Sequence, residues 1–119
     1  MSQSIVLVGD IRVVDDVDGT ILYQTSVNTK FTTGTLKIAH GRNTIAAAAA
    51  KSILAMVGFS TAKFAYLKSS YPIDVEINDS GTFDIDSTTD LFLKGNITQL
   101  EAAGNASNIS VIDYIMVGE

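Results

Sequence analysis

The sequence of 119 residues contains no cysteine, no tryptophan, one histidine and one proline. Without cysteine there is no disulfide and no thiolate ligand, so redox sites and zinc sites built on cysteine are excluded. Because His40 is the sole histidine, a metal site made of several histidines of one chain is excluded as well. These absences leave few kinds of site chemistry open to the chain.

Charged residues are also scarce: they make up 18% of the sequence, whereas 46% of its residues are apolar. A soluble domain usually carries roughly 25% charged residues. Apolar surface that charge does not cover is commonly buried between subunits, which predicts a homo-oligomer or a docking protein. The alternative is a monomer covered by the plentiful Thr, Ser and Asn. A net charge of −5 disfavours a nucleic-acid partner, because binding to phosphates requires a basic surface.

The two signs of charge occupy different stretches of the chain. The basic stretch holds Lys30, Lys37, Arg42, Lys51, Lys63 and Lys68, and the acidic stretch holds Asp74, Glu76, Asp79, Asp84, Asp86 and Asp90. In one interpretation, neighbouring strands bring the two sets together so that they neutralise each other. In the other, a positive face of one subunit meets a negative face of the next, head to tail.

No segment predicts secretion or a membrane span. Residues 1–9 have neither the basic start nor the long apolar core of a signal peptide. The longest apolar run, residues 45–50, is far shorter than the roughly 18 residues that cross a bilayer. We therefore expect no membrane partner.

Alternating apolar and polar residues predict a mostly β protein, an antiparallel β-sandwich or jelly roll formed by a single domain over residues 1–119. Asp18-Gly19 lies between two β-rich runs, 5–14 and 20–27, and predicts a hairpin, because glycine adopts positive φ without strain. Further turns are expected at 30–34 and 40–43.

Two later segments predict strands with distinct environments. Residues 73–77 alternate between apolar and acidic side chains, which is typical of a strand with one face in the core and one in water. Residues 109–117 are apolar on both sides and predict a strand buried on both faces. Asp113 is the exception in that strand, so it needs a partner or an exposed edge.

One short helix is expected at 44–57. Asn43 or Thr44 supplies a cap, the alanines favour helix, and Gly58 stands where a helix would end. Its apolar stripe of Ile45, Ile53, Leu54 and Val57 is imperfect. The alternative is two short strands meeting at 51–52.

A catalytic centre is not recognisable. Because His40 is followed by Gly41, we expect it to be an exposed turn residue. The chain has neither a nucleophile elbow nor a phosphate-binding loop. Two oxygen-rich stretches are weak calcium candidates, Asp15, Asp16 and Asp18, and Asp84, Asp86 and Asp90. Turn chemistry and a solvated strand face explain the same residues. We therefore expect no catalytic residue, no cofactor site and no metal site.

The second half of the chain has a recognisable order of strands and turns. Residues 67–78 form a strand, a serine pair, a second strand and Asn78, and the apolar segments 91–95 and 97–100 follow. Residues 105–108 then form a polar turn before the terminal strand. Over about residues 60–119, this order resembles the small virion structural proteins of tailed bacteriophages, β-sandwich or jelly-roll proteins that decorate or cement the head. The helix at 44–57 is not part of that pattern.

What this resemblance implies is symmetric assembly, often as trimers, on a capsid or tail surface. The expected partners are further copies of the chain and the major capsid protein or another virion protein. The protein would be located in the virion, assembled in the host cytoplasm. The resemblance carries no catalytic residues. A second hypothesis is a carbohydrate- or peptide-binding module, which would require an exposed aromatic platform. A third is a small enzyme, which would require a titratable partner for His40.

Overall fold

The computed structural model describes residues 3–33, 37–46, 51–104 and 107–118. Contacts separate the chain into two compact units, residues 1–35 and 36–119, and each is described by itself. The described residues form strands and turns and no helix, which confirms the predicted mostly-β, antiparallel fold. The strands are β1 (Gln3–Val14), β2 (Ile21–Thr33), β3 (Lys37–Ile45), β4 (Ser52–Ile53), β5 (Ala62–Ile77), β6 (Ile85–Ile97), β7 (Leu100–Gly104) and β8 (Ser110–Gly118).

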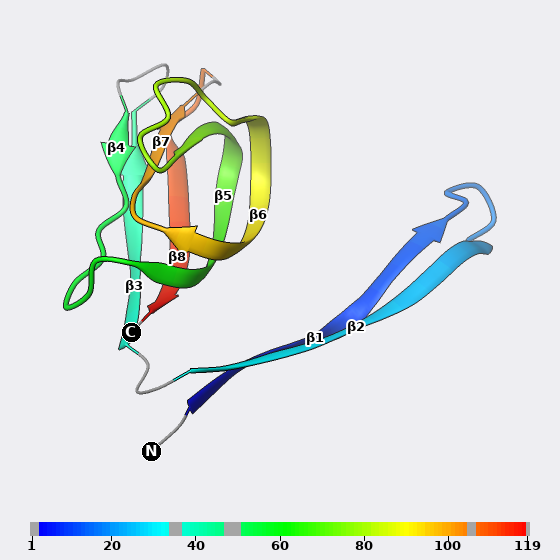
Figure 1. Cartoon of the computed structure of the whole chain (residues 1–119). Helices are drawn as coiled ribbons and strands as arrows, with labels where there is room; N and C mark the ends of the chain where they lie inside the picture. The colour runs from blue at the N-terminus through cyan, green and yellow to red at the C-terminus, as the bar shows by residue number, and fades with distance from the viewer. Residues whose placement is uncertain (1–2, 34–36, 47–50, 105–106, 119) are drawn as a thin grey trace. The chain divides into compact units, whose positions relative to one another are not determined.

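The first unit is a single long hairpin of β1 and β2 (Figure 1). Gly19 has a φ of +75° in the connecting turn, which confirms the hairpin predicted from Asp18-Gly19. The expected turn at 30–34 is wrong over its described part, because β2 continues to Thr33 and pairs there with Gln3. Pairing with β1 thus extends the strand over residues whose sequence alone does not decide between strand and turn.

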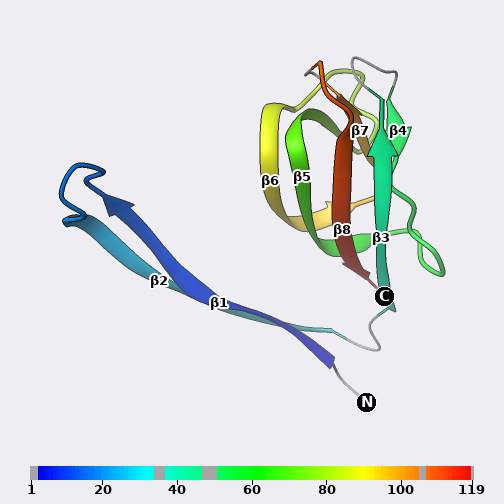
Figure 2. The same cartoon turned by 180° about the vertical axis from the view of Figure 1, so that it is seen from behind.

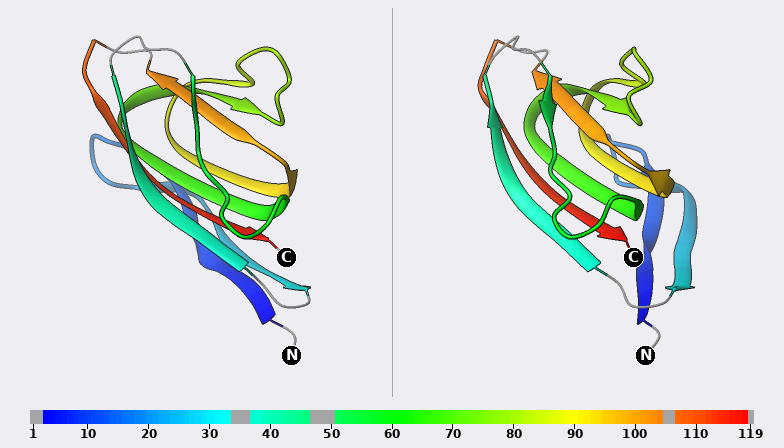
Figure 3. Two further views of the ribbon diagram at one scale, coloured as in Figure 1. Left: turned by 90° about the vertical axis from the view of Figure 1, so that its left-hand side faces the viewer. Right: turned by 60° about the vertical axis from the view of Figure 1, so that its left-hand side comes forward.

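The second unit is one six-stranded sheet with the order β3-β8-β5-β7-β4, and β6 lies along the other edge of β5. Figure 2 shows β3, β8, β5 and β6 side by side. The long strand β5 changes neighbours: residues 62–69 pair with β8, and residues 73–77 pair with β7. The change falls at Pro72, which has no N–H for a ladder hydrogen bond. This exchange lets the sheet curve into a nearly closed barrel (Figure 3).

The core lies inside this curved sheet. Ile112 and Met116 of β8 are fully buried, as are Leu67, Ile73 and Val75 of β5. Strand β8 lies between β3 and β5 in the sheet. The expectation that it is buried on both faces is wrong, because Val111 and Ile115 are only half-buried and Asp113 is exposed on its outer face, while Ser110, Ile112 and Met116 are buried. The core cluster is Ile45, Leu54, Ala62, Ala65, Leu67, Ile73, Val75, Ile97, Leu100, Ala102, Ile112 and Met116.

The predicted helix at 44–57 is wrong in its described residues; residues 47–50 lie outside them. Thr44 and Ile45 end β3, and Ser52 and Ile53 form the short strand β4. The apolar stripe that a helix would bury is split here, because Ile53 and Val57 are 58% and 77% exposed. Ile45 and Leu54 reach the core from extended backbone instead. The alternative of two short strands describes this segment better.

The expected turn at 40–43 is also wrong. His40, Gly41, Arg42 and Asn43 lie inside β3 and pair with residues 115–112 of β8. Gly41 gives room in this strand to the ring of Tyr114, since a Cβ there would lie 3.1 Å from the Tyr114 hydroxyl.

Among the described residues, no helix has the length and apolarity needed to cross a membrane.

Candidate interaction surface

The register of the hairpin sorts its side chains onto two different faces. Cross-strand partners share a face, and successive residues alternate between faces. One face, here called the apolar face, carries Ile5, Leu7, Ile11 and Val13 from β1 with Tyr23, Thr25, Val27 and Thr29 from β2. The opposite, polar face carries Val6, Val8, Asp10, Arg12, Gln24, Ser26, Asn28 and Lys30. The described side chains of the apolar face include no charge.

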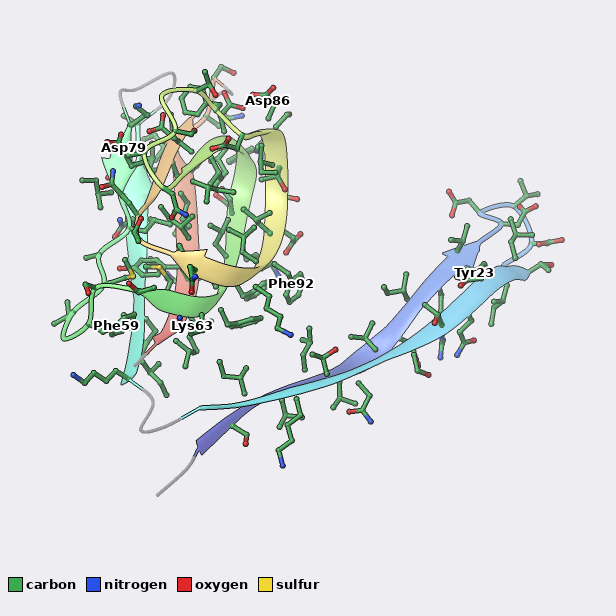
Figure 4. All side chains as sticks on the ribbon, in the orientation of Figure 1. Tyr23, Phe59, Lys63, Asp79, Asp86 and Phe92 are labelled. Carbon is green, nitrogen blue, oxygen red and sulfur yellow. The ribbon has the colours of Figure 1, made fainter. Side chains whose placement is uncertain are left out.

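The apolar face has no covering layer of its own. Ile11, Val13 and Tyr23 are 54%, 50% and 61% exposed, and Figure 4 shows the side chains along the hairpin. A two-stranded hairpin is marginally stable in water and needs a further layer against its apolar side. In the described part of the chain β1 and β2 pair with each other alone, so each strand keeps one edge unpaired, which favours pairing with another chain. The first unit therefore has the properties of an association surface.

The hairpin turn uses its aspartates for backbone contacts. Asp15 Oδ1 accepts the N–H of Val17 at 2.8 Å, and Asp18 Oδ1 accepts the N–H of Thr20 at 2.9 Å. The hydrogen bonds from Thr20 lower the pKa of Asp18. Val17 at the tip is 96% exposed. The described geometry is that of an Asx-stabilised turn with an apolar tip.

Asp84 has a similar role in the second unit. Its Oδ2 accepts the N–H of Ile77 and the hydroxyl of Ser80, both at 2.8 Å. These two donors favour the carboxylate and lower the pKa of Asp84, the Ile77 contact most strongly. Asp84 thereby closes the turn between β5 and β6, where Asn78 and Asp79 have positive φ.

This turn should loosen in acid. Because the pKa of Asp84 is lower in the folded state than its ordinary value of 3.8, its contribution is complete above that pH and is lost as the pH falls through the lower folded value. We expect the carboxyl carbon of Asp84 to titrate below pH 3.8 by NMR, with faster exchange of the Ile77 amide once it is protonated. In Asp84→Asn the exchange of that amide should lose this pH step. A midpoint at the ordinary aspartate value would contradict the assignment.

A carboxylate cluster lies where β4, β5 and β7 meet. Among the residues that the structure describes, Glu76, Asp79 and Glu101 are the one group of three acidic side chains with ligand atoms within 4.8 Å of one another. Neither weak calcium candidate, at 15–18 or 84–90, forms such a group in the described chain. Glu76 and Glu101 are direct cross-strand neighbours.

Lys51 is the cation of this cluster. Its Nζ lies 2.8 Å from Glu76 Oε2, and the pKa of Lys51 is raised, mainly by this hydrogen bond and then by the charges of Glu76, Glu101 and Asp79. Glu76 is 1% exposed, so the expectation that its side chain faces water is wrong. The ion pair fastens the start of β4 to β5. The four residues of the cluster come from three separate stretches of the chain, at 51, at 76 and 79, and at 101. No local sequence signal links these stretches.

The outer face of the sheet carries His40 and a row of opposite charges. His40 is exposed, and its row continues through Ile115, Tyr66 and Phe92, which offer it no carboxylate. In the neighbouring row, Arg42, Asp113, Lys68 and Asp90 alternate in sign across four strands.

Arg42 and Asp113 in that row form an ion pair, with Nε 2.7 Å from Oδ1. The predicted partner of Asp113 is thus found, and the pKa of Asp113 is lowered, first by its hydrogen bond from Arg42. In this row, one residue of the basic stretch, Lys68, is the cross-strand neighbour of one residue of the acidic stretch, Asp90; Asp113 belongs to neither stretch.

No family model matches the chain, and neither a curated protein nor a solved structure matches it.

Proposed function

We propose that the chain is a non-enzymatic structural protein that self-associates through the apolar face of its hairpin and docks on a viral shell. The observation that carries the proposal is this face, which has no described charge and three side chains at least half exposed. The low charge content of the whole sequence favours the same conclusion. Bacteriophage decoration or cement proteins are the class that the strand order of residues 60–119 resembles.

The occupant of the apolar face is, in this proposal, the same face of other copies of the chain. Twelve residues per strand and two strands make a face of about 40 Å by 10 Å, or about 400 Å². That is the size of the largest apolar patches on ordinary monomers, which are often functional. Two or three such faces packed together bury no charge, whereas a charged partner would lose solvation without gaining an ion pair.

A repeated shell would supplement the strength of this contact. Each copy contributes a modest apolar area, but copies held together by their hairpins meet the shell at several points at once. Virion and major capsid protein are therefore the proposed location and partner. The trimer that the resemblance implies would bring three hairpin faces around one axis.

Sedimentation and light scattering of the full chain test the proposal. We expect a species heavier than the 12.6 kDa of one chain, with a mass of three chains if the trimer is formed, and cosedimentation with phage shells. A chain that stays monomeric at high concentration and does not bind shells would contradict it.

A carbohydrate- or peptide-binding module is the second candidate, favoured by one observation. Tyr66 and Phe92 lie with ring centroids 4.5 Å apart, and Phe92 is 57% exposed. Tyr66 also donates a hydrogen bond to Asp90 at 3.2 Å, so aromatic and polar groups lie together, as sugar recognition requires. The rings are tilted by 30° and form a smaller platform than the hairpin face. An absence of binding on a glycan array would remove this candidate.

A further inference from the structure

The carboxylate cluster of Glu76, Asp79 and Glu101 contains one buried oxygen atom without a hydrogen-bond donor. Lys51 Nζ lies 2.8 Å from Glu76 Oε2. The other oxygen of the same carboxylate, Oε1, is buried and has no donor among the described residues. Because the Glu76 side chain is 1% exposed, bulk solvent does not reach this oxygen either. A buried carboxylate oxygen left unpaired is costly, and a bound ion is one of the few arrangements that would satisfy it.

The cluster also holds more negative charge than its own cation balances. Three carboxylates carry three negative charges and Lys51 supplies one positive charge, which leaves a net charge of −2. Glu76 and Glu101 are direct cross-strand neighbours, a position in which like charges destabilise a sheet. The side-chain amide of Gln99 donates to Glu101 Oε1, but this donor is neutral. One divalent cation would supply the missing positive charge.

The spacing of the three carboxylates fits a single calcium ion. Their ligand atoms lie within 4.8 Å of one another. Two oxygens that bind the same Ca²⁺ at about 2.3–2.6 Å are at most about 5 Å apart, so all three carboxylates are already within reach of one ion. Mg²⁺ requires shorter distances of about 2.0–2.1 Å and a strict octahedron, and it gives up its water reluctantly. A set of carboxylates from two strands and a turn therefore favours Ca²⁺.

The cluster is held by the sheet on one side and open to solvent on the other. Glu76 and Glu101 are fixed by the ladder between β5 and β7. Asp79 is exposed in the turn that follows β5 (Figure 4). Burial is thus graded from exposed Asp79 through half-buried Glu101 to buried Glu76. An ion can enter beside Asp79 without unfolding the sheet.

We propose that Glu76, Asp79 and Glu101 form a Ca²⁺ site, in which Glu76 Oε1 binds the ion while Oε2 keeps its hydrogen bond from Lys51. The bound ion brings the net charge of the four side chains to zero, and water completes its coordination. Lys51 then acts as a tethered competitor, because its ammonium group repels the ion. The site includes neither of the oxygen-rich stretches at 15–18 and 84–90, and it does not depend on the proposed self-association.

Calcium titration of the full chain, followed by NMR, tests the site. We expect the amide signals of Glu76, Asp79 and Glu101 to shift together, with one dissociation constant of about 1 mM or lower, as in weak Ca²⁺ modules. Mg²⁺ should bind at least about tenfold more weakly. The absence of a saturable shift at these three amides up to about 10 mM Ca²⁺, or equal affinity for the two ions, would overturn the site.

Asp79→Asn and Asp86→Asn are a matched pair for this titration. Both aspartates are exposed, and each variant loses one negative charge. Asparagine tolerates the positive φ of position 79, so both variants should fold. We expect Asp79→Asn to raise the dissociation constant for Ca²⁺ at least about tenfold, because it removes a ligand, and Asp86→Asn to raise it less than about threefold. Equal effects would indicate general attraction to an acidic protein and would contradict a defined site.

Lys51→Met distinguishes a calcium site from an ion pair that needs no further cation. Removing the competing ammonium group should lower the dissociation constant for Ca²⁺ at least about threefold. Calcium should also raise the melting temperature of this variant more than that of the wild-type chain, since the ion then compensates for the lost partner of Glu76. A folded Lys51→Met chain that binds Ca²⁺ no more tightly than the wild type would refute the role of Lys51 as competitor. If this variant does not fold even with Ca²⁺, the Asp79 and Asp86 pair decides the result.

Discussion

Val13→Asp should abolish association through the hairpin, weakening it at least about 100-fold. Val13 lies opposite Tyr23 on the apolar face and is half exposed in the single chain. Packing this face against another copy would bury the new carboxylate among apolar side chains, without a cation on that face to pair with it. Each copy contributes the same residue, so the cost is incurred more than once per assembly. The measurement is sedimentation equilibrium at about 1 M salt, where contacts between exposed charges are screened.

Val8→Asp is the matched control for this variant. Val8 lies on the same strand and is 69% exposed, but its side chain belongs to the polar face, beside Asp10 and Lys30. The chemical change and the loss of β propensity are equal in the two variants, so unfolding of the hairpin would affect both alike. Equal masses for Val13→Asp and Val8→Asp would show that the apolar face is not the contact.

Short-range turn chemistry made the hairpin predictable from the sequence. Gly19 has positive φ, and the hydrogen bonds that close the turn join residues no more than five positions apart, Gly19 to Asp15 and Asp15 to Thr20. Residues 5–8 are all apolar, so the sequence does not separate the two faces of the hairpin there. The hairpin forms a unit of its own with an open face because the later strands pair with one another. The local sequence pattern does not show which distant strands pair.

The errors lie where distant strands decide the outcome. Alanine-rich residues 46–50 favour helix locally, yet Ile45 and Leu54 enter the core from the extended segments on either side. Residues 40–43 contain Gly and Asn, but the ladder with β8 holds them in a strand. Glu76 follows the alternation of a solvated face, yet it is buried beside its cross-strand neighbour Glu101, where Lys51 supplies the opposite charge. In each case a tertiary contact outweighs the local preference.

The pairing of charged residues also depends on contacts between distant strands. The basic and the acidic stretch meet where Lys68 is the cross-strand neighbour of Asp90 and where Lys51 forms an ion pair with Glu76. Which charges are neutralised and which remain depends on strand register, and a sequence pattern alone does not fix the register of distant strands.

Gly118→Ala should cause a larger loss of stability than Gly41→Ala, the other glycine of the second unit whose added Cβ would meet a neighbour. A Cβ at Gly118 would overlap the carbonyl oxygen of Thr61 and would lie 2.7 Å from Cδ2 of Phe59. The carbonyl belongs to the backbone that leads into β5, so β8 or β5 must move to make room. Gly118 pairs with both Lys37 and Ala62, and such a movement would strain two ladders at once. We expect the free energy of unfolding to fall by about 3 kcal/mol, the upper range for inserting a methyl group into a packed site.

Two other glycines complete a graded series. Gly41→Ala should cost less, about 1 kcal/mol, because its Cβ would meet the Tyr114 side chain at 3.1 Å, and a side chain can rotate away more easily than a strand. Gly9→Ala should leave the stability of the second unit unchanged, since no described atom other than those of its chain neighbours lies within 4 Å of the added Cβ. Chemical denaturation of the three variants checks the order. A loss for Gly118→Ala no larger than that for Gly41→Ala would mean that the end of β8 adjusts freely, and the close approach of β8 to Thr61 would then not be a fixed part of the fold.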